Sequence, residues 1–205
     1  LLNRRITEKL ANIMSKKFFE VIVSPNYGKK AFDILNKKKN LILLKLDKID
    51  TFKNDYKSTI FGTIYQNLDK SKINRRFCKL VAHKRVSNKL LDDLIFSLKI
   101  VKHLKSNAIV LSANKQTLGL GTGQSNRADA LNIALNNLRT NFKNKNFVCA
   151  SDGFFPFTDS LKILKKNNCT VVAQPSGSVN DYKNISYANK NKISLYFSKN
   201  RIFKH

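Results

Sequence analysis

The sequence predicts an α/β protein, folded as a three-layer α/β/α sandwich around a mostly parallel mixed sheet. Short apolar strands alternate with amphipathic helices along most of the chain, an order typical of right-handed crossovers and of a sheet covered on both faces. The chain has 205 residues, of which 42% are apolar and 14 are Phe, so it can bury a core of that kind.

The first 47 residues predict an α-β-α-β unit. Apolar side chains at helical spacing, ending at Phe18, predict a helix over residues 7–19. A strand at 21–23, a helix around 31–35 and a strand at 41–46 follow. From 48 to 85 the periodicity weakens and predicts a connection, in which residues 59–65 alternate like an edge strand of a hairpin.

Residues 86–205 predict the larger part of the sheet, beyond a subdomain boundary near Val86. Ser87 is expected to cap a helix whose apolar residues recur from Leu91 to Val101. The rest of the pattern predicts strands at 108–111 and 117–120 joined by a turn at 114–115, a helix around 131–138, a strand at 147–150, a helix at 158–166, a strand at 170–173, a helix at 181–189 and a strand at 193–197.

The formal net charge of +26 would fit a protein that binds nucleic acid or an anionic surface. The lysines are spread along the whole chain, in expected turns and on polar helix faces. We therefore interpret most of them as solvated surface, with a polyanion site as the alternative. No apolar run approaches the roughly 20 residues that a membrane-spanning helix needs, which predicts a soluble protein.

The three cysteines are far apart and form no CxxC motif. This spacing argues against a zinc knuckle or a disulfide framework and fits a reducing, cytoplasmic environment. Cys149 and Cys169 lie in apolar stretches and are expected to be buried. The chain starts without Met or a signal-peptide layout, which we interpret as a piece of a larger protein.

Three loops that follow strands and open helices are the predicted ligand-binding segments, because sites in α/β sheets form where strands end. In residues 119–127, alternate glycines would let backbone N–H groups approach a ligand; a plain strand-to-helix turn is the alternative. Residues 151–159 carry three Phe around a Pro, as core packing or as a wall for a planar ring. Residues 174–181 would recognise a planar amide, or simply cap a helix through Asn180 or Asp181.

The histidines give no catalytic motif. His83 and His103 are expected on the surface, and His205, as the last residue, would be a frayed end on composition alone. No Ser-His-Asp order, HExxH or paired-carboxylate spacing indicates a hydrolase.

The chain resembles AICAR transformylase, the C-terminal domain of the bifunctional enzyme that also carries IMP cyclohydrolase. The resemblance rests on the ordered motifs at residues 105–110, 119–127, 151–157 and 174–178, on the ending 201–205 and on the upstream segment 19–25. It implies two cytidine-deaminase-like α/β/α halves without a metal ion. Residues 1–47 would end the first half, 48–85 would connect, and 86–205 would form the second half.

The implied reaction is formyl transfer from 10-formyltetrahydrofolate to AICAR in purine biosynthesis, giving FAICAR and tetrahydrofolate. At the matching positions, the AICAR contacts would be Asn107, Arg127, Phe154 and Arg201, and the folate contacts Ala128, Asp159, Ser178 and Val179. His205 would reach the reacting amine, and Asn107 would hold the formyl oxygen or the carboxamide. The resemblance also implies a homodimer, with no membrane and no specific nucleic acid as partner.

Departures from the family pattern are Gly153 for the usual Ala, Thr158 for the usual Arg and Lys204 for the usual Arg or His. The family's catalytic Lys-His-x-x-Pro motif and its cyclohydrolase domain do not occur in the 205 residues. We therefore expect a fragment that is inactive alone. The alternatives are a basic nucleic-acid-binding α/β module and an inactive dimerisation remnant of the enzyme.

Overall fold

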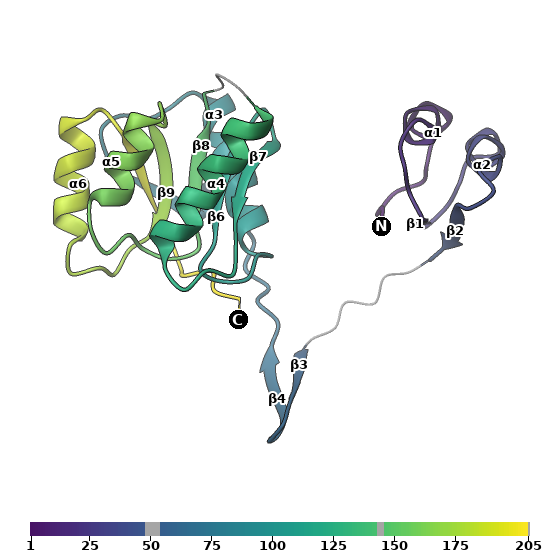
Figure 1. Cartoon of the computed structure of the whole chain (residues 1–205), viewed down its shortest axis with the longest axis horizontal. Helices are drawn as coiled ribbons and strands as arrows, with labels where there is room; N and C mark the ends of the chain where they lie inside the picture. The colour runs from purple at the N-terminus through teal and green to yellow at the C-terminus, as the bar shows by residue number, and fades with distance from the viewer. Residues whose placement is uncertain (48–53, 143–145, 205) are drawn as a thin grey trace. The chain divides into compact units, whose positions relative to one another are not determined.

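A computed structural model describes residues 1–47, 54–142 and 146–204 of the chain (Figure 1). It divides into two compact units, residues 1–70 and residues 71–205. Among the described residues, no helix has the length and apolar character needed to cross a membrane.

The first unit contains the predicted α-β-α-β order. Its elements are α1 (Glu8–Ser15), β1 (Val21–Ser24), α2 (Lys29–Asn36) and β2 (Ile42–Lys45), and β1 pairs with β2 in parallel. Thr7 caps α1 by accepting a hydrogen bond from the Leu10 N–H at 3.4 Å. A small core formed by Ile6, Ala11, Ile22, Ala31 and Leu35 joins these elements.

The predicted helix over residues 7–19 is too long. α1 ends at Ser15, and the Phe18 side chain beyond it is 86% exposed. Helical spacing alone does not bury a side chain, because the last turn must also face a covering layer.

The expected hairpin forms, but its strands differ from the predicted ones. β3 (Asn54–Thr59) pairs antiparallel with β4 (Gly62–Asn67), so residues 60 and 61 form the turn rather than the middle of a strand. Gly62 takes a φ of +127°, a conformation that other residues rarely adopt. The alternation of residues 59–65 therefore runs across a turn.

The second unit is built on a six-stranded sheet of order β5-β10-β9-β8-β6-β7. Its elements, after a 3-10 turn at Arg75–Phe77, are β5 (Cys78–Ala82), α3 (Asn88–Val101), β6 (Ile109–Ala113), β7 (Gln116–Gly121), α4 (Arg127–Asn141), β8 (Val148–Ser151), α5 (Asp159–Lys166), β9 (Val171–Pro175), α6 (Asp181–Lys190) and β10 (Ser194–Ser198). The pairings show that β7, β8, β9 and β10 point the same way, whereas β5 and β6 run opposite. The predicted mixed sheet is thus confirmed, with two parallel and three antiparallel pairings.

Helices cover both faces of this sheet, which confirms the three-layer α/β/α fold (Figure 1). On one face, α4, α5 and α6 share a core with Ile109, Leu111 and Cys149 of the sheet. On the other, α3 packs against Val110 and Ala150. Successive side chains of a strand point to opposite faces of the sheet, so neighbouring residues of one strand belong to the cores on its two faces.

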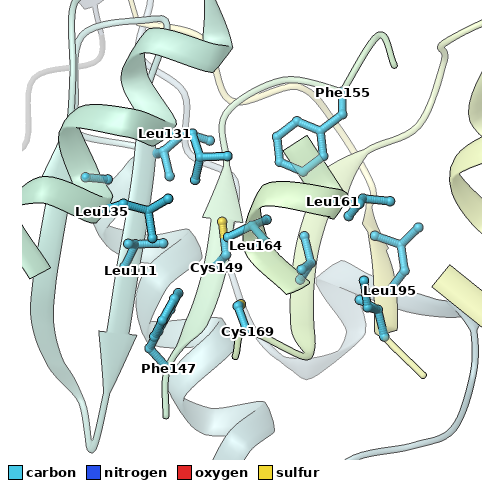
Figure 2. Packing of buried hydrophobic residues seen from close by; sticks show 14 of the residues in the cluster. Leu111, Leu131, Leu135, Phe147, Cys149, Phe155, Leu161, Leu164, Cys169 and Leu195 are labelled. Atoms are coloured by element: carbon cyan, nitrogen blue, oxygen red, sulfur yellow. The ribbon is translucent and has the colours of Figure 1, made fainter. Parts of the chain in front are cut away.

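Three local predictions in this unit are confirmed. Ser87 caps α3 by accepting from the Leu90 N–H. Asn114 and Lys115 form a turn with φ of 52° and 54°, and their N–H groups donate to the buried Asp93 carboxylate at 2.9 and 2.7 Å. Cys149 and Cys169 are fully buried (Figure 2). β5, by contrast, lies in the segment expected to be a connection.

Candidate functional site

Strand direction brings the three predicted loops to one edge of the six-stranded sheet. β7, β8 and β9 point the same way, so the loops after them leave the sheet at the same edge. β10 ends there too and leads into the C-terminal segment 199–204, while the antiparallel β6 begins there next to Asn107. Five segments therefore meet around one region.

The glycines of the first loop do not have the expected role. A Cβ at Gly119 would lie 2.0 Å from the Ala134 carbonyl oxygen, and one at Gly121 would lie 1.8 Å from that of Ala130. Both glycines lie in β7 and allow α4 to pack closely on the strand. The expectation that they bring N–H groups to a ligand is wrong for these two positions.

Asn107 holds the rest of this loop in place. Its Nδ2 donates to the carbonyl oxygens of Gln124 and Ser125, at 2.9 and 3.1 Å, and its backbone N–H donates to Gln124 as well. The loop then enters α4, where Asn126 accepts from the Asp129 N–H at 2.8 Å. Both amide hydrogens of Asn107 are thus engaged, which leaves Oδ1 as the acceptor of this side chain.

The aromatic loop divides its phenylalanines between two environments. Phe155 is fully buried in the cluster that contains Leu131 and Leu161 (Figure 2). Phe154, its neighbour, is half-buried and stacks with the Arg201 guanidinium, whose carbon lies 4.8 Å from the ring centroid. Phe157 is 63% exposed. Core packing thus explains Phe155, and only Phe154 remains as a ring-binding wall.

Hydrogen bonds tie the second loop to the third. The Phe155 N–H donates to the Gln174 side chain at 2.9 Å, and the Asn184 side chain donates to the Phe155 carbonyl at 2.8 Å. Asn180 donates from Nδ2 to the Pro156 carbonyl at 2.8 Å. These contacts fix the backbone on the C-terminal side of Phe154.

The third loop is organised by Asp181, the first residue of α6, whereas Asn180 at the N-cap makes no side-chain capping bond. Its Oδ2 accepts from the N–H groups of Gly177 and Ser178, at 2.8 and 3.3 Å. Val179 is 91% exposed at the tip of the loop. A Cβ at Gly177 would lie 3.5 Å from Arg201 Nη2, so the guanidinium lies close to this loop as well.

The C-terminal segment is hydrogen-bonded into the site. Ser106 N–H donates to the Lys204 carbonyl at 2.8 Å, and Ile202 N–H donates to the Asp152 carbonyl at 3.0 Å. The Arg201 guanidinium carbon also lies 5.9 Å from the centroid of the Phe203 ring. Arg201 is therefore placed by its neighbours although it is exposed.

Arg127 forms the most buried ion pair among the described residues. Its Nη2 donates to Asp152 Oδ1 at 3.1 Å, and the side chains are 14% and 0% exposed. The guanidinium carbon lies 5.8 Å from the centroid of the Phe203 ring. Asp152 and Phe203 were not predicted as site residues; the position of Asp152 directly after a strand was the available signal.

The structure brings four predicted residues into this region, namely Asn107, Arg127, Phe154 and Arg201. The predicted folate contacts lie on exposed loop and helix ends: Ala128 in the first turn of α4, Asp159 in an ion pair of 3.1 Å with Lys162, and the pair Ser178 and Val179. His205 lies outside the described residues. His83 and His103 are exposed, as predicted.

No metal site forms among the described residues, where His, Cys, Asp and Glu never gather in groups of three or more. Burial raises the pKa of the Cys78 thiol to about 11 and that of Cys169 to about 12. Burial thus favours the protonated form of both thiols near neutral pH.

Comparisons with known proteins cover the whole chain. A family model described as "AICARFT/IMPCHase bienzyme" matches residues 1–137. The "Bifunctional purine biosynthesis protein PurH" of Caldicellulosiruptor saccharolyticus is 39% identical over 206 residues, covering 99% of this chain and 39% of that protein. Its counterpart from Caldicellulosiruptor bescii is 40% identical with the same coverage. That of Acetivibrio thermocellus is 39% identical over 207 residues, covering 99% of this chain and 40% of that protein.

The chain thus spans about two fifths of the length of the curated relatives that it matches.

Proposed function

Because the chain belongs to the AICARFT/IMPCHase bienzyme family, we propose that the edge formed by Arg127, Phe154 and Arg201 binds the nucleotide AICAR for formyl transfer. The family resemblance seen in the sequence is confirmed, and the relatives' name places them in purine biosynthesis. The observation that carries the proposal is the convergence, at one sheet edge, of two guanidinium groups and a half-buried aromatic ring.

The three side chains suit the parts of AICAR. A guanidinium binds a phosphate with two parallel N–H donors, which a Lys ammonium does not provide. Phe154 offers a flat apolar face to the imidazole, with Arg201 stacked against it. We assign Arg201 to the phosphate because it is exposed, whereas Arg127 is engaged by Asp152.

The reaction joins the AICAR 5-amino nitrogen to the formyl carbon of 10-formyltetrahydrofolate. The amine loses its proton as the C–N bond forms, and the bond to N10 of the folate breaks as N10 gains a proton. We assign His205 to the amine proton. Because both amide hydrogens of Asn107 are engaged, we propose that its Oδ1 accepts from the AICAR amine or carboxamide instead of stabilising the formyl oxygen.

The folate would bind beside the nucleotide, along Ala128, Asp159, Ser178 and Val179. These residues belong to the loops and helix starts of the same edge, and Val179 offers an apolar surface that nothing covers within the described residues. Thr158, at the N-cap of α5, makes no side-chain capping bond. Its place beside Asp159 fits a weaker folate side than an Arg would give.

Titration calorimetry of the purified chain with AICAR tests this proposal. Arg201→Lys is expected to weaken binding about tenfold and to change its salt dependence, because a bidentate charged contact is lost. Phe154→Ala is expected to weaken binding with little salt dependence, since stacking and desolvation are hardly screened. Arg139→Lys, an exposed arginine on α4, is the matched control.

Two results would contradict the assignment. Wild-type protein that is folded and does not bind AICAR would remove the proposed function. A large drop in melting temperature for Phe154→Ala, with unchanged AICAR affinity in the folded fraction, would move Phe154 from the site to the core.

We further propose that the chain acts within a homodimer and needs residues that it does not contain. None of its 205 residues forms the Lys-His-x-x-Pro motif that the family resemblance implies, so the chain alone is expected to bind AICAR without forming FAICAR. FAICAR formation at rates typical of enzymes, measured on the purified chain, would overturn this expectation. Sedimentation velocity measures the oligomeric state.

A further inference from the structure

We infer that Asp152 is the positioning residue of this edge, which orients the Arg127 guanidinium and ties the C-terminal segment to the sheet. The inference rests on the proposed function only where it concerns AICAR. The contacts of Asp152 itself are independent of any ligand.

Asp152 joins three segments of the site through three different groups. Its N–H donates to the Ala108 carbonyl at 3.2 Å, at the residue after Asn107. Its carbonyl accepts from Ile202 N–H at 3.0 Å, between Arg201 and Phe203. Its carboxylate accepts from Arg127 at 3.1 Å. One residue thus contacts the start of β6, the C-terminal segment and the start of α4.

The pair with Arg127 fits a positioning role because it is buried and incomplete. The Asp152 side chain is fully buried, and its Oδ2 has no hydrogen-bond partner within the described residues. Arg127 uses Nη2 for this bond, while its buried Nε likewise makes none. A buried carboxylate costs free energy unless a cation stays beside it, so Asp152 restricts where the guanidinium lies.

Gly153 provides the space for this arrangement. A Cβ at residue 153 would lie 2.0 Å from Arg127 Nη2, 2.5 Å from Arg127 Cζ and 2.8 Å from Phe203 Cε1. The guanidinium therefore occupies the volume that any other side chain would take at this position. Its φ is not among the positive ones, so an alanine here would disturb contacts rather than backbone conformation.

The two possible roles of the Asp152 charge predict opposite changes in AICAR affinity. Asp152 is an anion beside an arginine of the proposed AICAR site, so its Coulomb effect alone weakens the binding of a phosphorylated ligand. If Asp152 only neutralised charge, Asp152→Asn would strengthen AICAR binding. If it orients Arg127, the same change weakens AICAR binding although the site becomes more positive.

The first experiment measures AICAR affinity by titration calorimetry for the wild type, Asp152→Asn and Gly153→Ala. We expect a loss of about tenfold for Asp152→Asn, the range of one charged hydrogen bond. Gly153→Ala, which restores the residue usual in the family, should give a smaller loss, because the ends of the Arg127 and Phe203 side chains can shift. The double variant should lose no more than Asp152→Asn, because both changes act through Arg127. Asp92→Asn, which removes an exposed carboxylate paired with Arg75 at 2.7 Å, is the matched control.

The second experiment needs no ligand. Arg127→Gln leaves the buried carboxylate without its cation and should lower the melting temperature by about 10 °C. Asp152→Asn introduced into that variant should restore most of the loss, whereas Asp92→Asn should not. Such a rescue is specific to a charge pair, because removing two independent structural contacts would add their effects.

The results of the two experiments bear separately on the positioning role and on the proposed function. Equal or tighter AICAR binding by folded Asp152→Asn, or no rescue of Arg127→Gln by Asp152→Asn, overturns the positioning role. Wild-type protein that fails to bind AICAR while the rescue still appears removes the proposed function and supports the pairing.

Discussion

The two units of the chain share one local pattern and differ in how well their strands are covered. In residues 71–205, helices cover both faces of six strands, and the side chains of β8 and β9 are buried throughout. In residues 1–70, β1 and β2 form a two-stranded sheet, and Ile42 and Leu44 remain 55% and 48% exposed. Alternation of strands and helices therefore predicts the elements, but burial depends on the number of strands and layers present.

The strands of the hairpin in the first unit are also poorly covered. Every residue of β4 is exposed, and Phe61 at the turn is 93% exposed. A hairpin of this size is marginally stable without further strands or a covering layer. Apolar surface of this extent is typical of regions that contact other parts of a protein or an assembly.

The largest expected effect separates a buried from an exposed phenylalanine. Phe155→Ala should lower the free energy of unfolding by about 3–5 kcal/mol, because it leaves a cavity in the core of the second unit. Phe18→Ala, in the first unit, should change it by less than about 0.5 kcal/mol. Denaturant unfolding of both variants measures the difference, and comparable losses would show that Phe18 is covered in solution.

Hydrogen exchange should distinguish the two sheets next. Amides of β8 and β9 lie in a covered sheet and should exchange only on unfolding of the second unit. Amides of β1 and β2 should exchange at least about 100-fold faster, because opening a two-stranded sheet exposes little buried surface. Equal protection in both sheets, measured by mass spectrometry, would contradict the comparison.

Thiol labelling should report on the second unit alone, since Cys78, Cys149 and Cys169 all belong to it. Burial raises the pKa of Cys78 to about 11, so at pH 8 roughly one thiol in 1,000 is ionised. Alkylation of the native protein should therefore be slow and should become fast when this unit unfolds. Rapid alkylation of Cys149 in native protein would mean that its core opens readily.

The smallest expected effect comes from an exposed ion pair. The hydrogen bond from Arg75 lowers the pKa of the Asp92 carboxyl below 3.8. A lowered pKa contributes stability above 3.8, and that contribution disappears as the pH falls through the pKa of the folded state. Asp92→Asn should thus lower the melting temperature slightly at pH 7 and not at all well below that pKa. An equal loss at both pH values would exclude the ion pair as its cause.

The sequence by itself determined the helices and strands of residues 86–205, though not β5, and the sheet edge at which the three predicted loops meet. Short apolar segments between helices predicted β6 to β10, and strands that share a direction must bring their following loops to one edge. The ordered motifs in those loops identified the family, which the comparisons confirm. These features depend on residues that lie close together along the chain.

Only the tertiary structure decided which loop residues are buried in the core and which lie at the candidate site. Phe154 and Phe155 are adjacent and identical, yet one stacks on Arg201 and the other is buried in the core that contains Leu161 of α5. The glycines of β7 are required by α4, and Asp152 meets Arg127 across 25 positions of sequence. Local periodicity encodes which face a side chain occupies. Its partners on that face come from distant segments, so they are fixed only when the layers pack.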